Sequence, residues 1–520
     1  MAASSESGSE SEKARIGSLS REDIRRLTDE LLNLRSALRA LESSQNLQSV
    51  HPDQIASARN LIHYVALRQQ DLRRLQEELS RGGFSSLGRC EAHVLDNVDA
   101  VLSILHALQN NQTRWNPTQP RPIDFAGGQG LIERRTVALF GPTPADRWAH
   151  IMVTMPSAAA DDYDLVRELV ASGMSCMRIN CSHDGPVEWL GMINNLRRAE
   201  TELGKPCRVA MDLGGPKLRT SQIATAKNSV LVQPGDRLFI VPDDLLPLSA
   251  ELAAEFSEFP TVGCTLSEVF ENLRPGERIL FDDGKIGAVI CEAHERRLIV
   301  EISRTRQDGE KLREDKGINL PDSELALGAL TSKDLEDLEF AVQHADILSY
   351  SFVRRPDDVL ALQNELERLG RPDMPIILKI ETRQAFERLP SLLLTAMRRP
   401  LAGVMIARGD LAVEVGYERL AEVQEEILWT CEAAHMPVVW ATQVLETLAK
   451  EGMPSRAEVT DAAMSVRAEC VMLNKGPFIV FAVKTLSDIL HRMQGHQSKK
   501  RPMLRRLHLA DDLAVERPPA

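Results

Sequence analysis

Lys379, Glu381 and Asp410 are the residues of this sequence best suited to do chemistry. They lie in the stretches 375–382 (PIILKIET) and 402–414 (AGVMIARGDLAVE), each of which begins with a short apolar run and then turns charged. Such a run is typical of a strand buried on both faces, and parallel α/β proteins bind ligands where these strands end. Two carboxylates can hold a hard divalent cation, and an ammonium beside them can neutralise phosphate oxygens. A structural ion pair is the alternative interpretation, but three such residues at strand ends favour a functional site.

The overall composition bounds the kind of protein this is. The chain has 520 residues, enough for two to four domains, and 43% of them are hydrophobic. A net charge of −13 argues against a general nucleic-acid partner. No apolar run approaches the ~18 residues of a membrane span, and the Ser/Glu-rich start lacks the apolar core of a signal peptide. The 8 cysteines show no C-x-x-C spacing, so we expect reduced, buried thiols and a cytoplasmic location.

The two ends of the chain differ from its centre. Residues 1–20 have the composition of a disordered segment, and residues 21–116 carry three apolar stripes at helical spacing, which predict a helical bundle. A dimerisation element is the alternative, but the stripes are shorter than sustained heptads. We expect a Pro/Gly-rich linker over 117–147 and a basic, solvated tail over 496–520. The stripes are Leu27, Leu31, Leu34, Leu38 and Leu41; Ile62, Val65, Leu72, Leu75 and Leu79; and Val94, Val98, Val101, Leu105 and Leu108.

The central region alternates apolar runs with helical segments, which is the pattern of a parallel α/β protein. Residues 221–316 interrupt it with short alternating runs and turn signals, typical of a small β-domain. The predicted fold class is therefore α/β: a (β/α)8 TIM barrel over 148–220 and 317–495, with an inserted β-barrel lid domain over 221–316. The expected strands are 150–155, 174–180, 208–213, 346–352, 376–381, 403–407, 437–442 and 470–474.

Polar residues follow most of these strands, and the barrel would bring them to one rim. Three arginines and one or two lysines near two metal-competent carboxylates suit a substrate with several anionic oxygens. Phosphoryl transfer needs this equipment, because its catalysis consists mainly of positioning and charge neutralisation. In chain order, these residues are Arg178, Asn180, Ser182, His183, Asp212, Lys217, Arg219, Lys379, Glu381, Arg408, Gly409, Asp410, Thr442 and Gln443.

Ten segments, in this order along the chain, carry a family resemblance: MRINCSHD, MDLGGPKLRT, FDDGKIG, DKGINLP, LTSKDLEDLEF, SFVR, LKIET, ARGDLAVE, ATQVLE and PSRAEVTD. Together they resemble pyruvate kinases over roughly residues 150–475, including the inserted domain, which in that family is a lid that closes over a nucleotide. The resemblance implies transfer of a phosphoryl group from phosphoenolpyruvate to ADP in glycolysis, giving pyruvate and ATP.

The resemblance also implies roles for individual residues. Glu381 and Asp410 would hold Mg²⁺ or Mn²⁺, and Lys379, Thr442 and Arg178 would be catalytic. The substrate site would comprise Lys379, Thr442 and the turn formed by Ala407, Arg408, Gly409 and Asp410. Phosphates or nucleotide would face Arg178, Asn180, His183, Arg219 and Lys316.

A potassium site of the family is altered in this sequence. Asn180, Ser182 and Asp212 match positions that hold K⁺ in many members, but Leu213 and Lys217 stand where potassium-requiring members have Thr and Glu. The ammonium of Lys217 would then fill the monovalent site as a fixed cation beside the same carboxylate. We therefore expect that K⁺ is not required.

Other departures bear on activity and regulation. The first strand ends in VTMPSAA where the family has a Thr-Ile-Gly-Pro turn, and 474–477 (NKGP) replaces a Ser-Gly-Glu-Thr segment near the active site. The family's C-terminal effector domain has no counterpart, so activation by a sugar phosphate through it is not expected. The N-terminal bundle would then supply the contact of a homo-oligomer. Neither nucleic acid nor a membrane is an expected partner.

Three functional hypotheses remain at this stage. The first is an active, metal-dependent pyruvate kinase, favoured by Lys379, Thr442 and the intact lid. The second is a metal-dependent lyase or aldolase that acts on pyruvate enolate, which would need neither the lid nor Lys316. The third is a catalytically weak or inactive relative that serves as a regulator or scaffold, which predicts loss of the metal pair. Fold alone does not decide between them.

Overall fold

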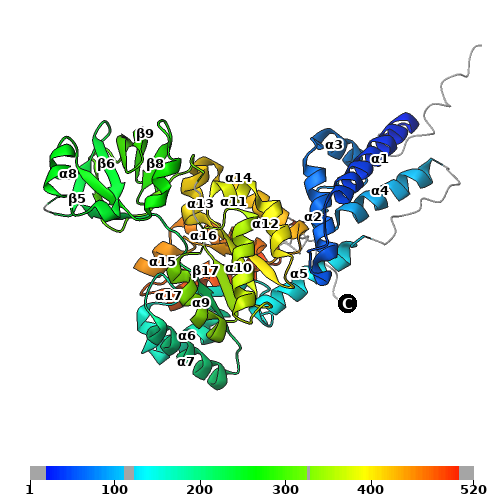
Figure 1. Cartoon of the computed structure of the whole chain (residues 1–520). Helices are drawn as coiled ribbons and strands as arrows, with labels where there is room; N and C mark the ends of the chain where they lie inside the picture. The colour runs from blue at the N-terminus through cyan, green and yellow to red at the C-terminus, as the bar shows by residue number, and fades with distance from the viewer. Residues whose placement is uncertain are drawn as a thin grey trace, which may run out of the picture.

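The computed structural model describes residues 19–109, 122–225, 227–324, 328, 330–499 and 501–502. The barrel lies at the centre, the lid projects from it on one side, and the helical bundle lies on another (Figure 1). The predicted disordered segment 1–20 lies outside the described residues except for its last two.

The eight predicted barrel strands are all present and close into a barrel, in the order β1-β17-β16-β15-β14-β13-β3-β2. Every neighbouring pair is parallel. The strands are buried on both faces, as continuous apolar runs predict. They are β1 His150–Thr154, β2 Cys176–Asn180, β3 Arg208–Asp212, β13 Ile347–Tyr350, β14 Ile376–Ile380, β15 Ala402–Ala407, β16 Val438–Ala441 and β17 Cys470–Leu473.

Helices connect successive barrel strands and pack around the outside. Gly173 and Gly204 end two of them in the left-handed conformation, which glycine adopts at helix C-termini without a steric penalty. The outer helices are α6 Tyr163–Ser172, α7 Pro186–Leu203, α9 Ser332–His344, α10 Pro356–Arg368, α11 Arg383–Glu387, α12 Leu389–Ala396, α13 Arg408–Val415, α14 Leu420–Ala433, α15 Glu446–Glu451, α16 Arg456–Met464 and α17 Ile479–Met493.

The lid is inserted between β3 and α9. It contains a seven-stranded sheet in the order β12-β8-β9-β10-β6-β7-β4 and a two-stranded sheet of β11 and β5. A bridge between Arg219 and Gly317 joins the two chain segments that lead into the lid. Its elements are β4 Thr220–Ile223, β5 Ser229–Val232, β6 Arg237–Pro242, α8 Ala250–Glu255, β7 Thr261–Cys264, β8 Arg278–Phe281, β9 Ile286–His294, β10 Arg297–Arg304, β11 Glu310–Arg313 and β12 Ile318–Asn319.

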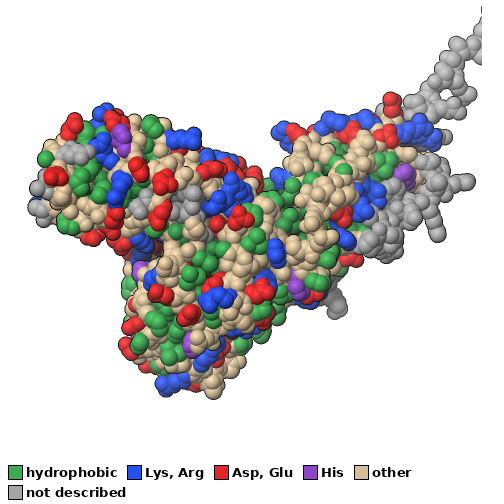
Figure 2. Space-filling view, in the orientation of Figure 1, with side chains coloured by type: hydrophobic (Ala, Val, Ile, Leu, Met, Phe, Trp, Pro, Cys, Tyr) green, Lys and Arg blue, Asp and Glu red, His purple; other side chains and the backbone are tan. Residues whose placement is uncertain are grey.

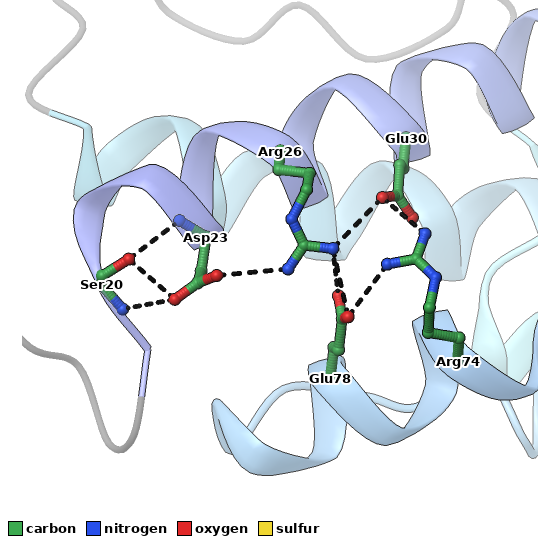
Figure 3. Close-up of polar contacts among 6 residues, drawn as sticks. All are labelled: Ser20, Asp23, Arg26, Glu30, Arg74 and Glu78. Atoms are coloured by element: carbon green, nitrogen blue, oxygen red, sulfur yellow. Dashed lines mark hydrogen bonds and ion pairs between the residues drawn. The ribbon is translucent and has the colours of Figure 1, made fainter.

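The N-terminal bundle has four α-helices where the stripes predicted three. The second stripe is split into α2 and α3, because the helix ends at Arg68 and a new one starts at Arg73. Two arginines and two glutamates tie α1 to α3 (Figure 3): Arg26 lies 2.8 Å from Glu78, and Arg74 lies 2.8 Å from Glu30. The helices are α1 Arg21–Ser44, α2 Ile55–Arg68, α3 Arg73–Arg81 and α4 Val94–Leu108.

The predicted linker over 117–147 contains helix α5 (Phe125–Phe140), so the expectation of a linker fails for this part of it. The C-terminal end of α5 enters the barrel core, where Leu139 and Phe140 pack among side chains of the strands. Gly403 makes room for this, because a Cβ there would lie 2.9 Å from Leu139. Helix α5 therefore plugs the end of the barrel opposite the carboxyl ends of the strands.

Buried hydrogen bonds fasten the bundle to the barrel. His435 follows α14, and its ring donates from Nε2 to Ala92 O at 2.8 Å and accepts at Nδ1 from Ser57 Oγ at 2.9 Å. Arg135 of α5 donates to the carbonyls of His435 and Asp53, at 3.0 and 3.1 Å. Bundle, α5 and barrel are thus joined by polar contacts that are buried or partly buried.

The remaining expectations concern the surface, the thiols and the tail. Acidic and basic side chains are interspersed on the face shown in Figure 2. All eight cysteines are free, and seven of them are buried. In the predicted tail, β18 (Gln497–Ser498) pairs with β19 (Arg501–Pro502). Residues 503–520 lie outside the described residues. Within the described ranges, no helix is both long and apolar enough to cross a bilayer.

The pH dependence of stability should report on the His435 contact. Burial lowers the pKa of His435 to about 4, whereas an imidazole in the unfolded chain titrates near 6.5. Between these values the unfolded state binds a proton that the folded state does not, so the free energy of unfolding falls as the pH falls from about 6.5 to about 4, by up to roughly 3 kcal/mol.

Thermal melts at neutral and mildly acidic pH check this. The variant His435→Gln should be less stable than the wild type at neutral pH, yet lose less stability on acidification. The matched change at an exposed histidine, His496→Gln, should follow the wild type. Equal acid sensitivity of His435→Gln and the wild type would contradict the assignment.

Candidate active site

The charged residues Lys379, Glu381 and Asp410 lie at the carboxyl end of the barrel. Lys379 lies near the end of β14, and its Nζ is 3.1 Å from Glu381 Oε1, 3.5 Å from Asp212 Oδ2 and 2.7 Å from Ser351 Oγ. Glu381 also accepts from the backbone N–H of Phe352 at 2.7 Å. Lys379 is 8% exposed and Glu381 is 3% exposed. A surface ion pair is thereby excluded for these two residues.

Arg178 and Asp212 extend the cluster to the neighbouring strands β2 and β3. Arg178 Nη2 lies 2.7 Å from Asp212 Oδ2, and Arg178 also donates to Thr154 Oγ1 at 2.8 Å. Asp212 is fully buried. Burial alone would raise the pKa of Asp212, but the positive charges of Arg178 and Lys379 outweigh it and hold that pKa below its ordinary value. Asp212 therefore stays ionised.

Asp410, the third residue of α13, is held by Lys217. Its two carboxylate oxygens lie 2.9 and 3.1 Å from Lys217 Nζ. Burial lowers the pKa of Lys217, but the charge of Asp410 more than compensates, so the pKa lies above its ordinary value. The expectation that Lys217 fills the monovalent site is thus not met, because its ammonium contacts a carboxylate of the predicted divalent-metal site instead.

Glu381 and Asp410 have the donor chemistry of a divalent-cation site. Burial raises the pKa of Glu381, the charge of Lys379 opposes this, and repulsion by the charge of Asp410 raises it further. A hard cation with oxygen ligands relieves such repulsion. No group of three or more His, Cys, Asp or Glu that could hold a metal occurs within the described ranges. The pair therefore fits Mg²⁺ or Mn²⁺ only where substrate or water completes the ligands.

The turn after β16 brings Thr442 to the first turn of α13. Thr442 Oγ1 accepts from the backbone N–H of Gly409 at 2.8 Å. Ala407, Gly409, Asp410 and Thr442 are therefore neighbours, as expected for one substrate site. Arg408 is different, because its guanidinium turns to Asp461 and to backbone carbonyls of the Thr442 turn.

A cavity of about 260 Å³ opens beside this cluster. It is lined by three of the predicted nucleotide-binding residues, Arg178, Asn180 and His183, together with Asn474 and Lys475 of the altered segment. Burial lowers the pKa of His183, and the charge of Lys475 lowers it further. The segment 474–477, which replaces the family's Ser-Gly-Glu-Thr, thus reaches the cavity through Asn474 and Lys475.

The other two predicted nucleotide-binding residues lie at the base of the lid. Arg219 is 3.1 Å from Asp315, and Lys316 is 3.2 Å from Asp282 at the end of β8. Neither residue lines the cavity of about 260 Å³. Both lie on the two segments through which the lid joins the barrel.

The predicted monovalent group is only partly assembled. Asn180 Oδ1 accepts from the backbone N–H of Ser182 at 3.2 Å. Asp212 Oδ1 is buried and has no hydrogen-bond partner among the described residues. Lys217, the fourth member, lies on Asp410.

The sequence reasoning missed Ser351, Thr154 and Asp461. Ser351 and Thr154 stand near the ends of the expected strands 346–352 and 150–155, so the strand-end criterion would have found them. Asp461 lies in the segment PSRAEVTD, which contributed to the family resemblance but received no role.

Comparison with known proteins agrees with this geometry. The family model described as "Pyruvate kinase, barrel domain" matches residues 146–477. The chain belongs to the pyruvate kinase family.

Relatives within the family are moderately similar. Pyruvate kinase of Leishmania mexicana is 33% identical over 347 residues, 66% of this chain and 66% of that protein. Pyruvate kinase of Clostridium acetobutylicum is 28% identical over 353 residues, 66% of this chain and 70% of that protein. Pyruvate kinase of Bacillus licheniformis is 29% identical over 350 residues, 66% of this chain and 57% of that protein. The chain thus spans about 57 to 70% of the length of these pyruvate kinases.

The Lys217–Asp410 pair predicts the metal affinity of the site. Removal of the ammonium in Lys217→Met leaves Asp410 free for a divalent cation, so Mn²⁺ should bind about tenfold more tightly, a change of about 1.4 kcal/mol. Titration of Mn²⁺ followed by electron paramagnetic resonance measures this without any assay of activity. Lys333→Met removes a comparable ion pair with Asp337 on α9 and should leave Mn²⁺ binding unchanged. Weaker binding in Lys217→Met would contradict the competition.

Proposed function

We propose that the protein catalyses transfer of the phosphoryl group of phosphoenolpyruvate to ADP, giving pyruvate and ATP, as a glycolytic pyruvate kinase of the cytoplasm. The observation that carries the proposal is the buried ammonium of Lys379, held between Glu381 and Asp212 at 3.1 and 3.5 Å. Membership of the pyruvate kinase family and the presence of the lid support it.

The cationic side chains supply charge neutralisation during transfer. As the bond from phosphorus to the enolate oxygen breaks and the bond to a terminal oxygen of ADP forms, charge is spread over the phosphoryl oxygens. Lys379 and Arg178 are both buried and fixed by carboxylates, so they need little reorganisation to meet that charge. A divalent cation bound by Glu381 and Asp410 would add further neutralisation of the phosphoryl oxygens.

The remaining product is the enolate of pyruvate, whose carbon must take up one proton. The hydroxyl of Thr442 faces the Gly409–Asp410 turn and belongs to the proposed proton-delivery path. Arg178, Asn180 and His183 at the cavity and Arg219 and Lys316 at the base of the lid are the proposed contacts of phosphates and nucleotide. Because the last two lie where the lid joins the barrel, lid closure would carry them toward the bound nucleotide.

The substitution Lys379→Met tests the proposal. The wild type should form ATP from phosphoenolpyruvate and ADP with Mg²⁺ or Mn²⁺ in a coupled assay, and the variant should lose about 10²–10³ in kcat, because one preorganised charge is missing. Lys484→Met removes an exposed ion pair with Glu168 and should keep wild-type activity.

The outcomes separate the three hypotheses. Absence of ATP formation by the wild type with either metal would refute the proposal and favour a regulator or scaffold. Turnover of pyruvate enolate without any need for nucleotide would favour a lyase. Equal kcat of wild type and Lys379→Met would show that Lys379 has no part in transfer.

Independence from potassium is a second expectation. This expectation rests on the sequence, in which Leu213 and Lys217 stand where potassium-requiring members have Thr and Glu. Activity in buffer free of Na⁺ and K⁺ should stay within about twofold of that with K⁺, and a fall of more than about tenfold would contradict the expectation.

A further inference from the structure

The backbone that presents Thr442 is in an unusual conformation. Thr442 has φ +63°, and Gln443 and Leu445 have φ +57° and +46°. A β-branched residue rarely adopts the left-handed region, because its branched Cβ crowds the neighbouring carbonyl oxygen. Such a conformation persists only where the surroundings hold it, and it is concentrated at functional sites. Contacts with the surrounding protein must therefore hold the turn at Thr442.

One guanidinium fixes the peptide groups on both sides of Thr442. Arg408 donates from Nε to Ala441 O at 3.0 Å and from Nη2 to Thr442 O at 2.5 Å. The first carbonyl belongs to the peptide group before the Thr442 Cα and the second to the one after it. Because the orientations of these two groups define φ and ψ, a rigid, planar guanidinium bound to both holds Thr442 in its left-handed conformation.

The guanidinium is itself held in place. Asp461 of α16 accepts two hydrogen bonds from it, 2.5 Å from Nη1 and 2.9 Å from Nη2. The face of the guanidinium lies 4.9 Å from the centre of the Trp440 ring. Arg408 is 5% exposed. A bidentate pair of this kind fixes direction as well as charge, so Asp461 decides where the donors of Arg408 point.

The conformation of this turn places the hydroxyl of Thr442 beside the start of α13. Thr442 Oγ1 accepts from the backbone N–H of Gly409, which is the neighbour of both Arg408 and Asp410. The two turns are thus linked twice, once through the guanidinium and once through the hydroxyl. Since every N–H side of the guanidinium faces protein groups, Arg408 is not the group that binds a substrate carboxylate.

We propose that Asp461 and Arg408 are positioning residues that fix the left-handed turn at Thr442 and so aim its hydroxyl at the reacting carbon. The inference rests on the proposed function, in which Thr442 belongs to the proton path. Among the described residues, the side chain of Asp461 hydrogen-bonds to Arg408, through which it reaches the Thr442 turn.

The test is Asp461→Asn, which keeps the shape of the side chain and removes its charge. In the coupled assay, kcat should fall by about 10- to 100-fold while KM for phosphoenolpyruvate stays within about twofold, since the hydroxyl is misplaced but the charged groups are not. Arg408→Lys, which keeps the charge and loses the planar fork, should show the same split. Asp461→Glu, which keeps the charge, should recover part of kcat. A variant with wild-type kcat, or one whose KM rises while kcat stays, would overturn the proposal.

A matched ion pair controls for general loss of stability. Arg467 and Glu425 form a pair of the same burial, with side chains 6% and 27% exposed, against 6% and 29% for Arg408 and Asp461. Glu425→Gln should keep wild-type kcat. Asp461→Asn should also have little further effect in a Thr442→Ala background, because both changes remove the same contribution. Additive losses would mean that Asp461 does not act through Thr442.

A structural measurement keeps the inference separate from the proposed function. In crystals of Asp461→Asn, Thr442 should leave the left-handed region, and its Oγ1 should lose the N–H of Gly409. This result does not depend on any activity, so it is informative even where the wild type makes no ATP. An unchanged φ at Thr442 in the variant would overturn the positioning role.

Discussion

The rim of the barrel depends on a buried network of opposite charges. Arg178 and Lys379 share Asp212, and Lys379 also contacts Glu381. None of these groups would tolerate dehydration alone, because the desolvation of a single buried ion costs several kcal/mol. Arg178 lies on β2, Asp212 on β3, and Lys379 and Glu381 on β14 and directly after it, so only the assembled sheet brings the four together. The strand order, the plugged opposite end and the helical shell all serve to keep these four side chains together.

A second group of contacts converts this network into a directed site. The network fixes charges but not the hydroxyl of Thr442, which stands on a backbone that would relax if it were free. Arg408 holds this backbone in one conformation, because it binds the carbonyls of both Ala441 and Thr442. It precedes Gly409 and Asp410 in the chain. One short segment, 407–410, thereby contributes a metal-competent carboxylate, a backbone donor to Thr442 and the side chain that holds the Thr442 turn. This explains why the segment is charged immediately after a buried strand.

The sequence predicted those features that depend on local pattern. All eight barrel strands were found, because each is a continuous apolar run, and the strand-end rule located Lys379, Glu381 and Asp212. Helix α5 was missed since Gly127, Gly128 and Gly130 read as a linker, whereas Gly128 is needed for close packing, as a Cβ there would lie 2.3 Å from Ala92 O. The partner of Lys217 was also beyond prediction. The pairing of Lys217 with Asp410 and not Asp212 is made by three-dimensional placement beside Gly317, where an added Cβ would lie 3.2 Å from Lys217 Cε. No spacing along the sequence encodes it.

The position of the bundle constrains what it can do. It contacts the barrel through α14, α5 and the segment around His435, at the end opposite the charged rim, whereas the lid joins at the rim itself. The contacts include buried hydrogen bonds to the carbonyls of Ala92 and His435, which are costly to break singly because each leaves an unpaired polar group in the interior. The bundle is therefore a fixed part of the barrel and not a swinging arm. Any influence it has on the rim must pass through the elements that it contacts, such as α5 and α14, since the described part of the bundle supplies no residue to the site.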